Sequence, residues 1–221
     1  MKLLAKILPV FILFVAGTTA FAAERSVDDA VADAAVQKAL KDIDAARSVT
    51  EQLLVQIGGI ISPSGQEHER AEAVAAHMRK IGLTDVHVNE APNVIGKIKG
   101  RSGKAIIFVS TLDDLMTVAD HQRTIGHLPT IEGDRVVGPG TNTTSTTIAS
   151  LAAAKILIAN GFQPEHDIIF AGVAEEETGL RGMRHLYEEY KDVAIGFVDV
   201  LGDGHSITYG GIGINWWRIN A

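Results

Sequence analysis

Three continuous apolar runs dominate the hydrophobic pattern of the chain, at Ala105–Ser110, Ile168–Val173 and Val193–Val200. Apolar runs of this length without polar alternation are typical of strands that are buried on both faces of a parallel sheet. Helical segments are predicted between them, over residues 144–160 and about 178–190. Strands that alternate with helices favour an α/β fold, a three-layer αβα sandwich whose mostly parallel, mixed sheet is covered on both faces.

The part of the chain before these runs is predicted to be mainly helical. Apolar residues recur at helical spacing over residues 26–60, and the same pattern returns over residues 66–81, where Gly82 is a natural helix end. Two strands are predicted next, at Asp85–Asn89 and Val94–Ile98. The sheet therefore gains two further strands before the first long apolar run.

The first 22 residues have the three parts of a secretory signal peptide. Lys2 and Lys6 precede an apolar run from residue 7 to 17, and Ala20-Phe21-Ala22 is a small-x-small cleavage site. The run of about 11 residues is short for a bilayer core of ~30 Å, so an uncleaved anchor is the weaker alternative. We expect residues 1–22 to be removed, residues 23–54 to form an N-terminal helical segment, and the exported, periplasmic or secreted chain to have no transmembrane span.

Composition narrows the classes of partner and the sources of stability. The 221 residues carry a formal net charge of −7 and a pI of about 5.6, which argues against a nucleic-acid partner, because phosphate binding needs a basic surface. The chain has no cysteine, so its stability outside the cytoplasm depends on its core or on bound metal. Trp216 and Trp217 lie in a strand-like segment at the C-terminus, where large rings are rarely left bare, and we expect more protein to follow.

Carboxylates gather where the three long apolar runs end. The ends carry Thr111–Asp114, Ala174–Gly179 and Asp199–Asp203, with three consecutive glutamates in the second. The carboxyl ends of parallel strands lie at one edge of a sheet, where ligands bind. Crowded carboxylates repel one another unless a cation compensates them, so these ends favour a metal site. The alternative for the glutamates alone is a solvated helix N-terminus.

Six stretches in order resemble a known family: residues 62–83, 93–100, 110–115, 138–157, 174–182 and 197–204. Together they resemble the aminoacylase/carboxypeptidase-G/peptidase-T family of co-catalytic zinc metallopeptidases of clan MH, over residues 55–221. The single-chain aminopeptidases of the same clan are the alternative. The resemblance implies a phosphorylase/hydrolase-like zinc peptidase fold, here a partial catalytic domain, without the lid and dimerisation domain and incomplete at the C-terminus.

The resemblance also implies roles for particular residues. Glu176 corresponds to the general base, Glu177 to a zinc ligand, and Asp113 to the aspartate that orients a ligand histidine. The carboxylate ligand after the next strand corresponds to Asp199, with Asp203 as the alternative.

Two positions depart from the family's pattern. The ligand histidine is Thr111, and the aspartate that bridges the two zinc ions is Thr143. Candidate replacement ligands are Asp114, His121, His127 and His205. The family binds two zinc ions, and for this chain we expect none or one.

Two hypotheses for function follow. The retained residues favour an exported metallopeptidase-like hydrolase acting on peptides or N-acyl amino acids, in which zinc lowers the pKa of bound water and a carboxylate takes its proton. The threonines at the ligand positions favour a non-catalytic relative that binds a peptide, a small ligand or a partner chain in the former cleft. Bound metal discriminates between them, because catalytic zinc usually has three protein ligands.

Overall fold

The structure is a computed structural model that describes residues 26–201. The predicted signal peptide and the segment with Asp203, His205, Trp216 and Trp217 lie outside the described residues. Within residues 26–201, none of the helices has both the length and the apolar character needed to cross a bilayer.

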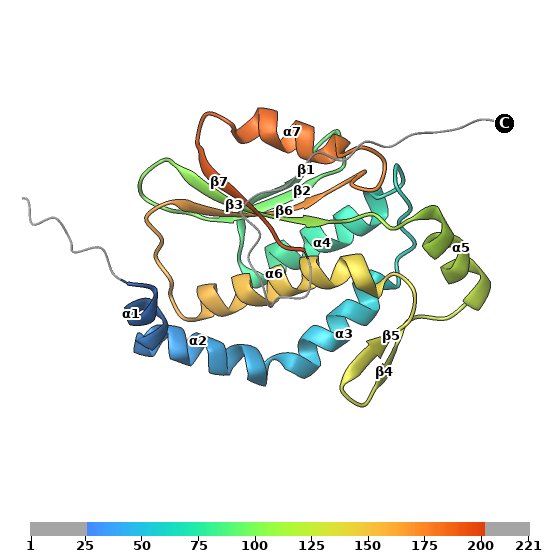
Figure 1. The fold of residues 1–221 in the computed structure, drawn as a ribbon, viewed down its shortest axis with the longest axis horizontal. Coiled ribbons are helices and arrows are strands. Elements are labelled where there is room, and N and C mark those ends of the chain that lie inside the picture. Colours follow the sequence, from blue (N-terminus) through green and yellow to red (C-terminus); the bar gives the residue numbers. More distant parts are fainter. Residues whose placement is uncertain (1–25, 202–221) are drawn as a thin grey trace, which may run out of the picture.

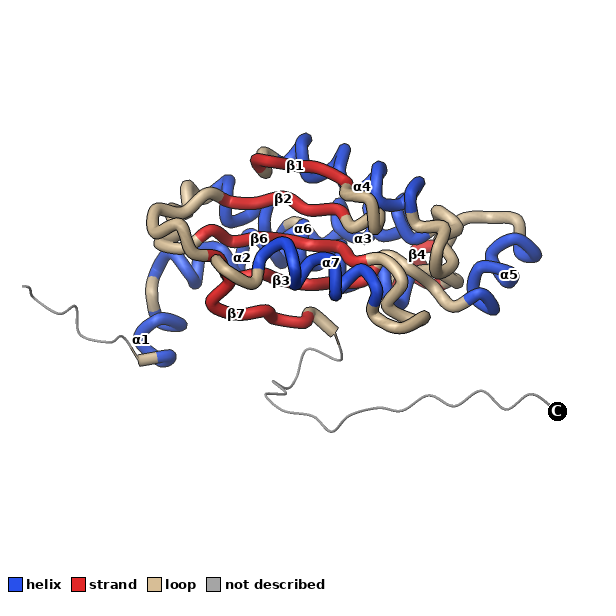
Figure 2. The backbone as a smooth tube through the Cα atoms, turned by 90° about the horizontal axis from the view of Figure 1, so that it is seen from above, coloured by secondary structure: helices blue, strands red, loops and turns tan. Residues whose placement is uncertain are grey.

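A five-stranded mixed sheet forms the centre of the molecule (Figure 2). Its strands, in spatial order, are β1 (Thr84–Val88), β2 (Val94–Ile98), β6 (Asp167–Val173), β3 (Ala105–Thr111) and β7 (Ala194–Asp199). β3 is parallel to both β6 and β7, whereas β2 is antiparallel to both β1 and β6. Only β2 among these strands therefore runs against the others, which confirms the prediction of a mostly parallel, mixed sheet.

Helices cover both faces of this sheet and confirm the three-layer αβα architecture (Figure 1). One face is covered by α4 (His68–Ile81) and α6 (Thr141–Ala159), and the opposite face by α7 (Arg181–Tyr190). On the far side of α6 lie α2 (Ala34–Ala45) and α3 (Arg47–Gly58), which both contact it. The short α1 (Val27–Ala32) precedes them.

The apolar runs supply a separate core to each face because successive strand side chains point in opposite directions. In β6, Phe170 packs with α4 and α6, whereas Ile169 and Ala171 pack with β3 and Leu186 of α7. Burial on both faces thus explains the apolar runs of β3 and β6. The prediction of a strand buried on both faces is wrong for β7, which is an edge strand of the described sheet with Ile195 and Val198 exposed.

Several elements differ from the sequence prediction. The helical region at 26–60 is divided into α1, α2 and α3, because the Asp33 side chain caps a new helix by accepting from the Ala35 N–H. The expected boundary between residues 54 and 55 falls inside α3. α5 (Met116–Ile125) and the hairpin of β4 (Thr130–Glu132) and β5 (Arg135–Val137) were not predicted. They lie between β3 and α6, and α5 extends beyond the carboxyl end of β3 (Figure 1).

Candidate functional site

The carboxyl ends of β3, β6 and β7 meet at one edge of the sheet, as the parallel arrangement requires. β3 ends at Thr111 and leads to Asp113 and Asp114. β6 ends at Val173 and leads into residues 174–180, which we call the glutamate loop. β7 ends at Asp199. The sequence prediction that these carboxylates lie at one edge therefore holds for the described residues.

Asp113 fixes the glutamate loop instead of facing solvent. Its side chain is fully buried, and its Oδ1 and Oδ2 accept the backbone N–H groups of Glu176 (3.0 Å) and Glu177 (3.1 Å). The Ser64 hydroxyl also donates to Oδ2 at 2.6 Å. Backbone N–H groups compensate a buried carboxylate well, so Asp113 needs neither a histidine nor a metal to be stable here.

Asp114 is held in a buried ion pair with Arg70 of α4. The Arg70 Nη2 donates to Asp114 Oδ2 at 2.7 Å, and both side chains are at most 3% exposed. The Thr143 hydroxyl donates to Asp114 Oδ1 at 2.6 Å. Thr143 stands where the resemblance implies a bridging aspartate, so Asp114 lies beside that position with its charge already neutralised by Arg70.

Thr111 stands where the resemblance implies a histidine ligand. Its side chain is buried, and the hydroxyl finds no hydrogen-bond partner in residues 26–201. Its carbonyl accepts from the hydroxyl of Thr147 on α6 at 2.8 Å. The position of the implied histidine ligand therefore holds a buried hydroxyl that no other described group pairs by a hydrogen bond.

The remaining carboxylates of this edge form an electrostatically strained group. Burial raises the pKa of Glu176, and the charges of Glu177, Asp113 and Asp199 raise it further. Partial loss of hydration also raises the pKa of Glu177, to which the charges of Asp113 and Asp114 add. Burial raises the pKa of Asp199 as well. Carboxyl groups with raised pKa values are better proton acceptors than ordinary carboxylates, and such groups cluster at functional sites.

These raised pKa values predict that stability falls as the pH rises. A carboxyl whose pKa is higher in the folded state binds more protons there than in the unfolded chain, so its stabilising contribution is complete below the ordinary value of 4.5 for glutamate and is lost as the pH rises through the folded pKa. We expect the free energy of unfolding to fall as the pH rises above about 4.5, and to fall less in a Glu176→Gln/Glu177→Gln variant.

Urea titrations across that range measure this slope. Asp167→Asn, at the opposite end of the sheet, is the control in which the effect on stability should have the opposite dependence on pH. Asp167 is largely buried, but the Gly100 N–H and Lys99 lower its pKa, so its stabilising contribution is present above its ordinary pKa. An identical slope in the wild type and the double glutamine variant would contradict the assignment.

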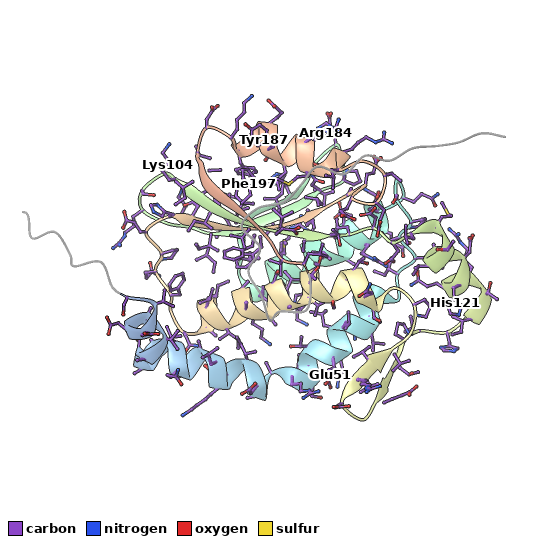
Figure 3. The ribbon with its side chains drawn as sticks, viewed as in Figure 1. Glu51, Lys104, His121, Arg184, Tyr187 and Phe197 are labelled. Carbon is purple, nitrogen blue, oxygen red and sulfur yellow. The ribbon has the colours of Figure 1, made fainter. Side chains whose placement is uncertain are left out.

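The candidate histidines of the described chain lie apart from these carboxylates. His121 lies on α5 and is exposed (Figure 3). His127 is also exposed, in the loop after α5, and its Nδ1 lies 2.8 Å from the Leu128 carbonyl oxygen. Neither is brought to Glu177 or Asp199 by the described contacts.

The described side chains do not fit the two-zinc site that the resemblance implies. Catalytic zinc usually takes three protein ligands, and within residues 26–201 no group of three or more His, Asp or Glu side chains is placed to hold a metal ion. Both Asp113 and Asp114 already use both oxygens in hydrogen bonds. Of the carboxylates of this edge, Glu176, Glu177 and Asp199 are not held in this way by the described residues, and Glu177 and Asp199 are the two to which the resemblance assigns a ligand role.

Sequence reasoning missed three residues that build this site. Arg70 and Glu67 are buried polar residues at the start of α4, and Asn93 is a buried residue before β2. The sequence carried a weak signal for Glu67 and Asn93, because both lie in the stretches that carry the family resemblance. It carried none for the pairing of Arg70 with Asp114, which are 44 residues apart.

Comparison with known proteins agrees with this architecture. The model of peptidase family M28 matches residues 93–207, which include β2, β3, β6, β7 and the glutamate loop. Carboxypeptidase G2 from Pseudomonas sp. (strain RS-16) is 26% identical over 155 residues, which cover 66% of this chain and 36% of the relative.

Two solved structures share the fold. Human carnosine dipeptidase 1 has a TM-score of 0.62 at 16% identity, over 74% of this chain and 40% of its own. The LapA aminopeptidase of Legionella pneumophila has a TM-score of 0.57 at 19% identity, over 80% of this chain and 46% of its own. The chain spans less than half the length of each of these three proteins. The resemblance to zinc peptidases and the peptidase fold are thereby confirmed.

Proposed function

Because the chain belongs to peptidase family M28, we propose that it is a hydrolase of peptide or amide bonds in which Glu176 is the general base and the metal site is reduced. The observation that carries this proposal is the position of Glu176. It lies at the carboxyl end of β6, and its backbone is fixed by the buried Asp113. Burial and three neighbouring carboxylates raise its pKa toward the range useful for proton transfer.

In the proposed reaction Glu176 takes a proton from the water that attacks the scissile carbonyl and passes it to the leaving amine. The negative charges of Glu177 and Asp199 help to raise the pKa of Glu176. These two carboxylates would also be available to bind a cation.

A reduced metal site is supported by two substitutions and one ion pair. Thr111 and Thr143 lack the imidazole and the carboxylate that the resemblance implies at these positions. Arg70 supplies a fixed positive charge to Asp114 beside Thr143. We propose none or one weakly held zinc ion, with hydrolysis correspondingly slow.

The proposed substrates are small peptides and N-acyl amino acids. The names of the proteins that this chain resembles, a carboxypeptidase, a dipeptidase and an aminopeptidase, support the peptides. The N-acyl amino acids rest on the family resemblance of the sequence alone. The proposed place of action is outside the cytoplasm, on the strength of the signal-peptide pattern in residues 1–22.

The proposal is tested by incubating the chain with a panel of dipeptides and N-acetyl amino acids and measuring the free amine that hydrolysis releases. We expect slow turnover by the wild type and a loss of about 10²–10⁴-fold in Glu176→Gln, because the general base is removed. Glu165→Gln makes the same chemical change at the exposed opposite end of the sheet, where Glu165 pairs with Arg101, and should leave the rate unchanged.

Two results would contradict the proposal. Equal rates in the wild type and Glu176→Gln would remove the general base from the account. No hydrolysis of any substrate, together with calorimetric binding of the same peptides, would favour the non-catalytic alternative.

A further inference from the structure

The backbone of the glutamate loop is anchored by side chains from outside it. Four consecutive N–H groups, from Ala174 to Glu177, each donate to such a side chain. The Ala174 N–H donates to Asn93 Oδ1 at 3.0 Å, the Glu175 N–H to Glu67 Oε1 at 3.0 Å, and the next two to Asp113. The place of the Glu176 carboxylate therefore depends on three buried acceptors.

Glu67 is the acceptor at the centre of this arrangement and comes from a different segment. Its side chain is fully buried, and its Oε1 accepts a second N–H group, that of Gly65, at 2.7 Å. Gly65 belongs to the turn that also provides Ser64, the hydroxyl donor to Asp113. One carboxyl oxygen thus joins the turn before α4 to the glutamate loop, and Ser64 with Asp113 joins them a second time.

The other oxygen of Glu67 argues against a purely stabilising role. Oε2 is buried and has no hydrogen-bond partner within residues 26–201. A buried polar atom without a partner is costly, and a few such atoms in native structures are retained for function. The unpaired Oε2 makes this carboxyl costly to bury. The hydrogen bonds that Oε1 accepts from the Gly65 and Glu175 N–H groups better explain why a carboxyl occupies this position.

The segment that Glu67 holds is strained. Glu175 has a left-handed φ of 53°, a conformation that side-chain-bearing residues rarely adopt. Just after the loop, Gly182 in the first turn of α7 approaches it so closely that a Cβ would lie 2.3 Å from the Ala174 carbonyl oxygen and 2.4 Å from Asn93 Oδ1. Such a conformation persists only when the surrounding contacts impose it, and the Glu67 contact is made at the strained residue itself.

We propose that Glu67 is a positioning residue that holds the glutamate loop through the Glu175 N–H and thereby places the Glu176 carboxylate for proton transfer. Its action on the rate rests on the proposed function of Glu176, whereas its action on the loop does not. A general base displaced by about 1 Å loses on the order of 10²-fold in rate, so a positioning residue acts mainly on kcat.

Three variants of the full chain test this proposal. Glu67→Gln keeps an oxygen acceptor of the same reach, Glu67→Asp withdraws it by one methylene, and Glu67→Leu removes it. Backbone hydrogen exchange at Glu175–Glu177 reports the state of the loop, and exchange in β3 and β6 reports the fold. We expect faster exchange in the loop by about 10-fold or more in Glu67→Leu and an intermediate effect in Glu67→Asp, with Glu67→Gln close to the wild type and unchanged exchange in both strands.

Kinetics on a dipeptide that the wild type cleaves separate positioning from binding. We expect kcat to fall by about 10- to 100-fold in Glu67→Leu with KM nearly unchanged, and to be rescued in Glu67→Gln. Unchanged loop exchange in both Glu67→Leu and Glu67→Asp would overturn the proposal, and so would faster exchange without loss of kcat.

The activity of the wild type and the exchange of the loop are separate readouts, so the proposed hydrolysis and the proposed role of Glu67 can fail independently. If the wild type cleaves nothing, hydrolysis by this chain is refuted, yet the exchange comparison still decides whether Glu67 holds the loop. If Glu67→Leu does not fold, Glu67→Asp decides it by the same measurements.

Discussion

Arg70→Met is expected to lower the free energy of unfolding by about 3–5 kcal/mol, because the substitution leaves the Asp114 carboxylate buried without its partner. Both side chains of this pair are almost completely buried, at 2.7 Å, so solvent cannot replace the guanidinium. Arg70 Nη1 also donates to the Leu112 carbonyl at 2.8 Å, which keeps only the Ser62 hydroxyl as a donor in the same variant. Methionine keeps most of the apolar volume, so the loss reports charge and hydrogen bonding.

Urea unfolding of the full chain measures this effect. Arg47→Met is the matched control, because the Arg47 side chain is mostly exposed and likewise makes one ion pair, with Glu51 at 2.8 Å, and one hydrogen bond to a carbonyl, that of Asp134 at 2.8 Å. Exposed pairs of this kind contribute about 1 kcal/mol or less. Arg70→Met/Asp114→Asn should recover part of the loss, because the unpaired charge is removed. A loss in Arg70→Met no larger than that in the control would refute the idea that Arg70 provides the fixed charge of this site.

Thr111→His/Thr143→Asp is expected to convert the fold into one stabilised by zinc. The variant adds an imidazole and a carboxylate to Glu177 and Asp199, which together supply four protein ligands, the number that a structural zinc ion takes and one more than catalytic zinc usually takes. Without metal, the new carboxylate replaces the hydroxyl that now donates to Asp114 at 2.6 Å, so two carboxylates repel each other. In chelator the variant should therefore be less stable than the wild type.

Thermal unfolding with added zinc and with chelator measures the difference. Ligand binding to the folded state alone stabilises it by about 2.7 kcal/mol at 100 times Kd, and the variant should show a zinc-dependent shift of that order. Thr117→His/Thr130→Asp carries the same changes at exposed positions and should show none. A double variant that responds to zinc no more than this control would mean that positions 111 and 143 do not face a common metal site.

The centre of the sheet was predictable from the sequence because β3 and β6 are apolar and largely buried on both faces. β2, β3, β6 and β7 lie within two residues of the predicted ranges, since a run such as residues 168–173 has few other uses in a globular domain. α5 and the β4–β5 hairpin were not predictable in the same way. α5 buries only Ala119 and Gln122, and the strands of the hairpin are three residues each, so neither leaves a long periodic pattern.

The candidate site was predictable in its location but not in its internal contacts. Parallel strands bring the residues after β3, β6 and β7 to one edge, and this follows from topology. The partners of Asp113 and Asp114 do not follow from it. They are backbone N–H groups 63 and 64 residues away and an arginine 44 residues away, chosen by tertiary packing. From the sequence alone, a charged residue in a helix such as Arg70 is expected to face solvent, and only the structure shows that it lies beside Asp114.

The zinc content of the wild-type chain is the most direct test of the reduced metal site. The full chain, purified and dialysed exhaustively against metal-free buffer, would be measured by elemental analysis alongside the Thr111→His/Thr143→Asp variant. Because a weakly held zinc ion is lost during dialysis, we predict well below one zinc per wild-type chain, with the fold intact by circular dichroism. One or two zinc ions per wild-type chain would contradict it and would show that the carboxylates of this edge recruit ligands beyond those that residues 26–201 bring together.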